Sequence, residues 1–234
     1  MKGRLYLIPS PLGDGPVEDV LPRPVLEAIG RIRRYVVEET RTVRRFLSRA
    51  GLRGHIEELE FYELNEHTDR AAIEGYLGLF DDGCDVGLIS EAGLPAVADP
   101  GAALVALCHR HGIEVLPFVG PSSLMLALMA SGLNGQCFAF KGYLPARPDE
   151  RKQSLRLLEK RSLSANETQM FIETPYRNDA LLSDILAVCS GRTRLCLGIN
   201  LTCPDQQIQC MTIGEWKQKN ISIGKRPCVF LMLA

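Results

Sequence analysis

The sequence predicts an α/β protein of two domains, the first with a mostly parallel sheet and the second with a mixed sheet. Strand-like and helix-like patterns alternate from the first residues to about residue 130, which is typical of a parallel sheet with helices on its faces. The last third is instead rich in strands, with one short helix among them, and this favours antiparallel pairing. A short Gly- and Asn-containing break at residues 132–135 separates the two patterns. We therefore expect domains at residues 1–133 and 134–234.

The elements of the first domain follow from short apolar runs and from helical periodicity. Strands are predicted at residues 5–8, 35–37, 59–62, 84–89 and 113–118. Helices are predicted at residues 25–33, 42–50, 68–80, 102–111 and 122–130.

In the second domain, a strand at residues 137–143, a helix at 147–163, a strand at 169–173 and a helix at 178–189 are expected. Three strands then follow at 193–199, 207–213 and 228–233, with a short helix at 215–219.

Composition and length place the chain among ordinary globular proteins. Its 234 residues are 46% hydrophobic and 24% charged, with a net charge of −1, enough to form a full core. The first residues lead directly into a strand pattern, and no apolar stretch is long enough to span a membrane. We expect a soluble, cytoplasmic protein without a membrane partner.

The 8 cysteines lie mostly in apolar runs, with no C-x-x-C pair and no histidine spacing typical of a zinc site. No metal is therefore expected. Reduced, buried thiols fit a cytosolic protein. Four of the cysteines recur every seven residues, a spacing that we interpret as coincidence because the segment crosses several elements: Cys189, Cys196, Cys203 and Cys210.

Arginines are concentrated between Arg31 and Arg53. A solvated helix face explains such a concentration, and so does a surface that follows a phosphate backbone. The near-neutral net charge of the whole chain weighs against the second interpretation.

Several common catalytic signatures are absent. The sequence contains no G-x-G-x-x-G after its first strand, no G-x-x-x-x-G-K-[ST], no G-x-S-x-G and no H-E-x-x-H. This disfavours nicotinamide enzymes, P-loop nucleotidases, α/β-hydrolases and zinc proteases of those types. It also disfavours the methyltransferases that use the common glycine-rich nucleotide fold.

The most informative segment is the loop of residues 90–101, which contains two glycines and two prolines between a predicted strand and a predicted helix. Such a loop fixes the path of the backbone and presents its amides and carbonyls to a ligand. Ligands of open α/β sheets bind beyond the carboxyl ends of the strands. We interpret the loop as a cofactor cradle, the alternative being a tight turn without a ligand.

Other loop motifs occur at strand ends along nearly the whole chain. In order they are Pro9-Ser-Pro-Leu-Gly13, Glu38-Glu-Thr-Arg41, Asn65-Glu-His67, Ser90 to Gly101, Val119-Gly-Pro-Ser-Ser123, Ser131-Gly-Leu133, Gly142-Tyr-Leu-Pro145, Glu173-Thr-Pro-Tyr-Arg177 and Leu201-Thr202. In this order and spacing the set resembles the tetrapyrrole methylase superfamily. It is most similar to the ribosomal branch, the small-subunit rRNA cytidine 2′-O-methyltransferases.

The resemblance implies two α/β domains with a cleft between them for S-adenosylmethionine, and usually a homodimer. It assigns cofactor contacts to Pro11, Leu12 and Gly13, to Ser90, Ala92, Gly93, Leu94, Pro95, Ala96 and Val97, to Ser122 and Ser123, and to Tyr143, Leu144, Glu173, Thr174, Leu201 and Thr202. S-adenosylmethionine is a sulfonium cation without phosphates, so carbonyls, carboxylates and apolar walls suffice to hold it.

The resemblance also implies that the substrate is RNA of the small ribosomal subunit, methylated at a ribose 2′-hydroxyl. A hydroxyl is a weak nucleophile and needs a proton acceptor, for which Glu38, Glu39 and Glu91 are the candidates. For Glu38 and Glu39 the alternative is a salt bridge with nearby arginines. Arg41 and Arg177 are candidates for binding substrate phosphate, or else form structural ion pairs.

The sequence also departs from the ribosomal branch, which has Asp where Glu39 and Glu91 stand. Its Leu-Thr-Lys motif becomes Leu201-Thr202-Cys203, and a further small C-terminal domain usually follows the point where this chain ends. Two other functions therefore stay open: methylation of a tetrapyrrole or another small molecule, and binding of cofactor or RNA without catalysis.

Overall fold

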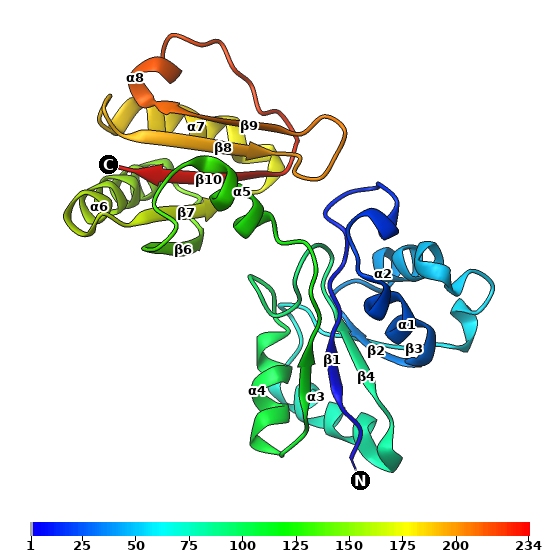
Figure 1. The fold of residues 1–234 in the computed structure, drawn as a ribbon. Coiled ribbons are helices and arrows are strands. Elements are labelled where there is room, and N and C mark those ends of the chain that lie inside the picture. The colour runs from blue at the N-terminus through cyan, green and yellow to red at the C-terminus, as the bar shows by residue number, and fades with distance from the viewer. Residues whose placement is uncertain (1) are drawn as a thin grey trace. The chain divides into compact units, whose positions relative to one another are not determined.

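The computed structural model describes residues 2–234, which form two compact units, one ending at Ser122 and the other beginning at Ser123. Each unit contains one five-stranded sheet with its own hydrophobic core (Figure 1). No helix in the described part of the chain is long and apolar enough to cross a membrane.

The first sheet is entirely parallel, in the order β3-β2-β4-β1-β5. Its strands are β1 (Leu5–Leu7), β2 (Arg34–Val37), β3 (Glu60–Glu63), β4 (Val86–Ile89) and β5 (Val115–Pro117). The predicted parallel sheet is confirmed, and all five strands end at one side, which we call the carboxyl edge of the first sheet.

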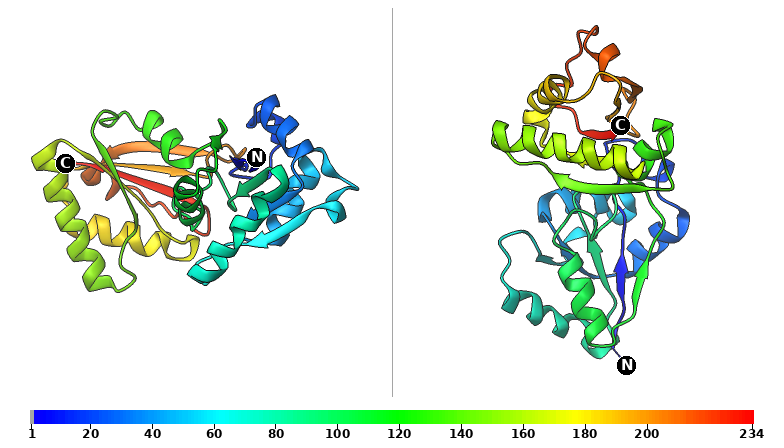
Figure 2. Two further views of the ribbon diagram at one scale, coloured as in Figure 1. Left: turned by 90° about the horizontal axis from the view of Figure 1, so that it is seen from below. Right: turned by 90° about the vertical axis from the view of Figure 1, so that its left-hand side faces the viewer.

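Helices cover both faces of this sheet (Figures 1 and 2). Successive side chains of a strand point to opposite faces, so Leu5 belongs to one core while Tyr6 and Ile8 belong to the other. The Tyr6 side packs under α1 (Arg23–Arg31) and α2 (Thr40–Leu47), and the Leu5 side under α4 (Ala102–Arg110). The short helix α3 (Arg70–Gly75) lies on the α4 side.

Gly87, in the middle of β4, makes room for its neighbours on the α1 face. A Cβ atom there would lie 2.8 Å from the Tyr35 ring and 2.9 Å from Cδ1 of Ile8. Both neighbours are fully buried, so they have little room to move. We expect Gly87→Ala to lower the free energy of unfolding by about 1–3 kcal/mol, measured by chemical denaturation. A loss no larger than that of an exposed substitution such as Gly15→Ala, where a Cβ meets nothing within 4 Å, would contradict this packing argument.

The second sheet is mixed, in the order β6-β7-β10-β8-β9, as the sequence predicts. Its strands are β6 (Phe138–Tyr143), β7 (Thr168–Ile172), β8 (Arg194–Ile199), β9 (Gln207–Thr212) and β10 (Cys228–Leu233). β6 is parallel to β7, whereas β10 is antiparallel to both β7 and β8, and β9 is antiparallel to β8. β6, β7 and β8 therefore run in the same direction and end at one side, the carboxyl edge of the second sheet.

Helices α6 (Pro148–Ala165) and α7 (Asn178–Val188) pack on one face of this sheet, and α5 (Ser123–Ser131) on the other (Figure 1). The short helix α8 (Ile213–Trp216) closes the core with Trp216, whose indole Nε1–H donates to the Leu195 carbonyl at 2.9 Å.

Two predicted helices differ from the structure. The helix predicted at residues 68–80 ends at Gly75 and continues as 3₁₀ turns over Tyr76–Gly83, because glycines at 75 and 78 weaken an α-helix there. The helix predicted at 215–219 begins earlier, at Ile213, because Thr212 and Glu215 form a capping box at that point.

Candidate functional site

Three loops converge at the carboxyl edge of the first sheet around Gly93. Ser10, after β1, and Gly93, after β4, exchange two backbone hydrogen bonds of 2.9 and 3.1 Å. The Ser10 hydroxyl also donates to the Ser90 carbonyl at 3.0 Å. Gly93 has φ +81°, and a Cβ atom there would lie 3.3 Å from Leu12 and 3.6 Å from the carbonyl of Pro121, so the loops after β1, β4 and β5 meet at this residue.

The loop of residues 90–101 is braced by Asp99. Its carboxylate accepts from the Ala96 amide at 2.9 Å and from the Gly101 amide at 2.7 Å. Ala96 and Ala98 both have positive φ, 65° and 62°, a conformation that non-glycine residues keep only when their surroundings enforce it. Asp99 holds Ala96 in this conformation. The sequence analysis did not single out Asp99, although an Asp before Pro-Gly signals such a turn.

Two carboxylates lie at the ends of the neighbouring strands β2 and β4. The chain leaves β2 toward β3, on one side of this pair, and leaves β4 toward β5, on the other side. Ligands of α/β sheets bind between two such strands, at the point where the strand order reverses. Glu38 follows β2, and its carboxylate accepts from the Glu91 amide at 3.4 Å. Glu91, beside it, is exposed. This places two of the three predicted acidic candidates together.

Burial raises the pKa of Glu38, Glu91 and Asp99, and their negative neighbours raise the pKa of Glu38 and Glu91 further. The neighbours that act on Glu38 include Asp99, and those that act on Glu91 include Glu38. Groups with pKa values perturbed by burial and like charge are common at functional sites. A cation placed here would relieve the repulsion.

Glu39 has a different environment. Its carboxylate caps α2, accepting from the Arg41 amide at 2.8 Å and the Thr42 amide at 2.6 Å. Hydrogen bonding with Thr42 is the main cause that lowers the pKa of Glu39. The Glu39 carboxylate therefore stabilises the start of α2. The Arg41 side chain, on the first turn of the same helix, is exposed.

At the carboxyl edge of the second sheet, three strand ends bring together the predicted residues of this unit. Tyr143 is the last residue of β6 and Leu144 follows it, Glu173 and Thr174 follow β7, and the β8–β9 turn contains Leu201 and Thr202. Leu144 and Leu201 are buried, whereas Tyr143 and Thr202 are exposed.

The β8–β9 turn is held by hydrogen bonds to the side chains of Asp205 and Gln206. Asn200 and Thr202 have positive φ. The Asn200 amide donates to Asp205 at 2.7 Å, and the Thr202 backbone amide donates to the Gln206 side chain at 2.8 Å. Asp205 and Gln206 thus fix the turn.

Glu173 is buried and pairs with Arg177 at 2.7 Å. Its other oxygen, Oε2, has no hydrogen-bond partner among the described residues, and the same is true of Arg177 Nε and Asn178 Oδ1. Unpartnered buried polar atoms are costly and require an explanation, and a bound polar ligand would supply one. The Glu173 carboxylate could accept from such a ligand, and Asn178, which the sequence analysis did not single out, also offers an unpartnered oxygen.

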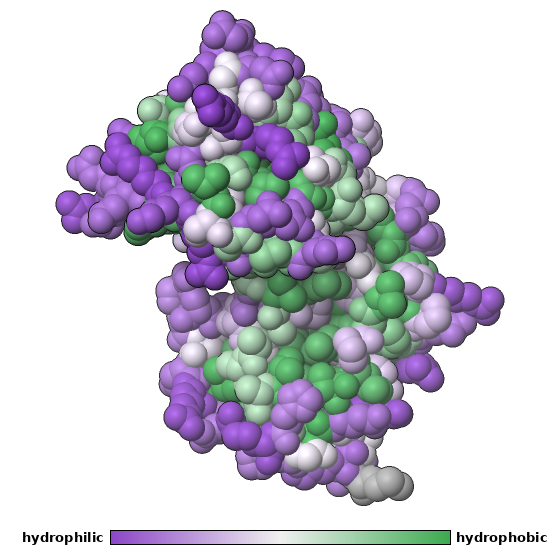
Figure 3. Space-filling view, turned by 60° about the vertical axis from the view of Figure 1, so that its left-hand side comes forward, coloured by the Kyte–Doolittle hydropathy of each residue, from purple (hydrophilic) through white to green (hydrophobic). Residues whose placement is uncertain are grey.

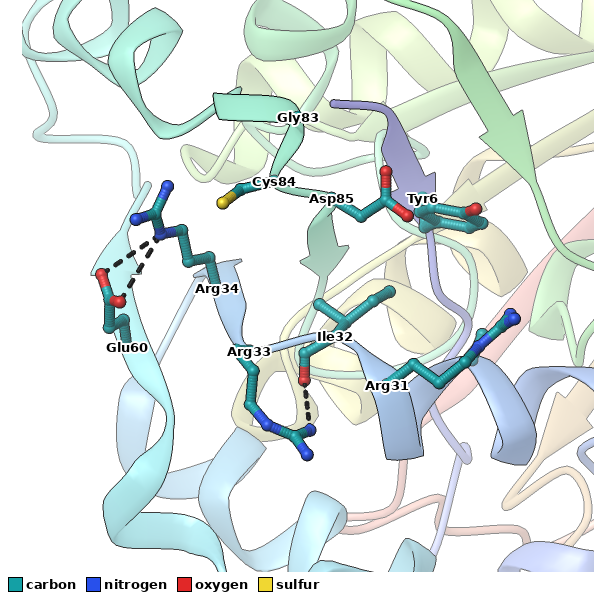
Figure 4. A pocket seen from close by; sticks show the side chains of 10 residues that line it. Tyr6, Arg31, Ile32, Arg33, Arg34, Glu60, Gly83, Cys84 and Asp85 are labelled. Atoms are coloured by element: carbon teal, nitrogen blue, oxygen red, sulfur yellow. Dashed lines mark hydrogen bonds and ion pairs between the residues drawn. The ribbon is translucent and has the colours of Figure 1, made fainter. Parts of the chain in front are cut away.

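The first arginines of the arginine-rich segment lie in a different region. A pocket of about 350 Å³ lies at the opposite, amino edge of the first sheet, lined by Arg31, Arg33 and Arg34 together with Cys84 and Asp85 (Figure 4). Arg34 donates to the Leu79 carbonyl at 2.9 Å and pairs with Glu60, and Arg33 donates to the Gly30 carbonyl. These two arginines therefore stabilise local structure.

Within residues 2–234, no group of three or more His, Cys, Asp or Glu side chains is placed to hold a metal ion.

A scan against protein-family models found no match. Named relatives do match, however. The chain is 31% identical to the ribosomal RNA small subunit methyltransferase I of Vibrio cholerae serotype O1, over 90% of this chain and 69% of that protein. It is 33% identical to the protein of the same name from Neisseria meningitidis serogroup B, over 91% and 69%.

Solved structures share the fold at low sequence identity. The methyltransferase CobJ aligns with a TM-score of 0.66 at 17% identity, covering 99% of this chain and 94% of that one. A diphthine synthase aligns with a TM-score of 0.65 at 16% identity, covering 99% and 90%. The chain belongs to the ribosomal RNA small subunit methyltransferase I family, the branch that its motifs resemble.

Proposed function

We propose that this protein is an S-adenosylmethionine-dependent methyltransferase that methylates a ribose 2′-hydroxyl in RNA of the small ribosomal subunit. Relatives at about 30% identity have the name ribosomal RNA small subunit methyltransferase I. The observation that supports the cofactor best is the convergence of the loops after β1, β4 and β5 at Gly93, beside the carboxylates of Glu38 and Glu91. We infer no tetrapyrrole substrate, since the neighbours that share the fold are too distant in sequence to indicate one.

The residues present fit the cofactor. Bound S-adenosylmethionine supplies a methyl group activated by a positively charged sulfur. Carboxylates at the carboxyl edge of the first sheet provide the negative potential that a sulfonium cation requires. Leu12, Gly93 and Pro95 would form part of its apolar surroundings.

The carboxylates would also move the proton of the ribose hydroxyl. One oxygen of Glu38 accepts from the Glu91 amide, whereas Glu91 is exposed, so Glu91 is the better placed of the two to meet a substrate. A raised pKa makes it a stronger base once it is ionised. Arg41, exposed near Glu38, would bind a phosphate of the RNA, while Arg177 is engaged by Glu173.

Methyl transfer from labelled S-adenosylmethionine tests this proposal. Small ribosomal subunits from a strain without the cognate methyltransferase should incorporate the label into their RNA. Ribose 2′-O-methylation should then make one phosphodiester bond resistant to alkali, because the 2′-hydroxyl is the nucleophile of alkaline cleavage. Absence of label in the RNA at every stage of subunit assembly would contradict the proposal.

The raised carboxyl pKa values give cofactor binding a defined pH dependence. Glu38 and Glu91 stay protonated above the usual carboxyl pKa and ionise as the pH increases. Affinity for S-adenosylmethionine should therefore rise several-fold between about pH 5 and pH 7. The stability of the free protein should change with pH in the opposite direction. A raised carboxyl pKa stabilises the fold below the usual carboxyl pKa, and this contribution is lost as the pH rises through the raised value.

Calorimetric titration across this range measures the effect. S-adenosylhomocysteine, whose sulfur is uncharged, is the matched control and should show a flatter profile. Equal pH profiles for the two ligands would mean that the carboxylates do not act on the sulfonium charge.

We also infer a homodimer in the cytoplasm, where ribosomal RNA would be its substrate. Helix α5 is apolar around most of its circumference, and Met129 is 78% exposed while Leu124 and Leu128 of the same helix are buried. Figure 3 shows hydrophobic residues at the surface among polar ones. Exposed apolar surface of this kind is typical of an interface.

Sedimentation velocity tests the dimer. The protein should sediment as a dimer at micromolar concentration, and Met129→Glu should shift it to a monomer. Leu163→Glu, at a residue that is 71% exposed on α6, is the control and should leave the dimer unchanged. A monomeric wild-type protein would refute this inference.

A further inference from the structure

Two cysteines of the second unit face each other across neighbouring strands. The register of the antiparallel β8–β9 pair places Cys196 directly opposite Cys210. Opposite residues in such a pair have Cα atoms about 4.5 or 5.5 Å apart, and disulfides form at Cα separations of about 4.4–6.8 Å. The backbone therefore needs little movement to join them.

The two thiols already interact. The hydrogen bond between them lowers the pKa of Cys210 to about 7, aided by the nearby Arg194 guanidinium. The same hydrogen bond, together with burial, raises the pKa of Cys196. The Cys196 S–H is therefore the donor and the Cys210 sulfur the acceptor, an arrangement that favours a thiolate at Cys210.

Access to the two sulfurs is unequal. Cys210 lies on β9, the edge strand of the sheet, and is half-buried. Cys196, on the next strand inward, is fully buried. An oxidant in solution thus meets Cys210 first, with Cys196 held behind it as a resolving thiol. Two members of the seven-residue cysteine series are brought together by the hairpin rather than by a helix.

We propose that Cys196 and Cys210 are a redox-active pair that closes to a cross-strand disulfide when the protein meets hydrogen peroxide. In the first step the Cys210 thiolate attacks a peroxide oxygen: an S–O bond forms, the O–O bond breaks, and the leaving oxygen departs as water after protonation. In the second step the Cys196 sulfur attacks Cys210, the S–S bond forms, and the hydroxyl leaves as a second water with the Cys196 proton. Two thiols are oxidised and one hydrogen peroxide is reduced to two waters.

The disulfide would close the chain from residue 196 to residue 210. This loop contains the β8–β9 turn with Leu201 and Thr202. Closing a loop reduces the freedom of the unfolded chain, so oxidation should raise the unfolding temperature of the second unit by several degrees. The fluorescence of Trp216, the one tryptophan of the sequence, reports on this unit.

The test uses the full chain with Cys203→Ser, which removes the third cysteine of the hairpin. The protein is treated with hydrogen peroxide, its remaining thiols are alkylated, and it is cut with trypsin and with a protease that cleaves before aspartate. The hairpin then yields fragments 195–204 and 205–217, each with one cysteine. We expect the two fragments to be joined after peroxide and to separate after reduction.

Two variants separate the roles of the two sulfurs. Cys210→Ser should abolish the linkage, and its Trp216 fluorescence shows whether the unit is folded. In Cys196→Ala, a sulfenic acid should accumulate at Cys210 and be trapped by dimedone. The proposal would be overturned if the folded Cys203→Ser protein oxidised Cys210 to sulfinic acid without joining the fragments, or if Cys210 did not react while the half-buried Cys84 did.

Discussion

Asp184→Ala is expected to lower the free energy of unfolding of the second unit by about 3–5 kcal/mol. Asp184 accepts from Arg151 Nε at 2.7 Å and pairs with Arg151 Nη2 at 2.5 Å. The Arg151 side chain is 5% exposed. Removal of its partner therefore leaves a buried charge whose remaining hydrogen-bond partner among residues 2–234 is the Ala146 carbonyl, at 3.0 Å. This ion pair links α6 to α7.

Trp216 makes this prediction measurable, because its fluorescence follows the unit in which the pair lies. Urea unfolding of Asp184→Ala should show a markedly lower midpoint. The double variant Arg151→Met/Asp184→Leu, which removes both charges and keeps apolar volume, should recover most of the loss. A single variant as stable as the wild type would show that Arg151 reaches solvent.

Asp99→Ala is expected to weaken S-adenosylmethionine binding by about 10- to 100-fold. The carboxylate holds the Ala96 and Gly101 amides, and hydrogen bonds to charged groups contribute about 1.5–3 kcal/mol, with each 1.4 kcal/mol corresponding to a factor of ten. Without this brace the loop leaves the conformation with positive φ at Ala96, and binding must restore it. Asp99 is thus a positioning residue.

Asp85→Ala is the matched control for this prediction. Asp85 comes directly before β4, whereas Asp99 comes after that strand. Like Asp99, Asp85 accepts a hydrogen bond from a backbone amide, that of Arg4, at 3.0 Å. It lies at the opposite edge of the sheet, beside the pocket of Figure 4. Its removal should lower stability without changing cofactor affinity. Equal losses of affinity in the two variants would indicate general destabilisation instead of a local role for Asp99.

The fold was largely predictable because both sheets leave a clear pattern in the sequence. Buried parallel strands such as β4 are short apolar runs between turn residues, and the strand-rich end of the chain indicated the mixed sheet. Boundaries failed where local chemistry overrides periodicity. Helix α3 ends at Gly75, although the apolar pattern in the sequence continues beyond it. The Thr212–Glu215 capping box starts helix α8 at Ile213, before the predicted start at residue 215.

The candidate site was predictable in its loops but not in its side-chain partners. Parallel strands bring their following loops to one edge, so Ser90, Gly93 and Leu12 could be grouped from topology alone. Asp99 before Pro-Gly signals a turn, but the sequence could not show which amides it holds, that Glu39 caps a helix, or that Cys196 faces Cys210. Each of these depends on strand register or on which backbone amide a carboxylate meets, and several partners are compatible with one sequence.

The most direct measurement for the central claim is a calorimetric titration of the wild-type protein and Glu91→Gln with S-adenosylmethionine and S-adenosylhomocysteine. The account predicts saturable binding of both ligands to the wild type. It also predicts that Glu91→Gln weakens binding of the cation more than binding of its uncharged counterpart, because the carboxylates at the ends of β2 and β4 act on the sulfonium charge. Absence of binding to the wild type, or equal weakening of both ligands, would contradict it.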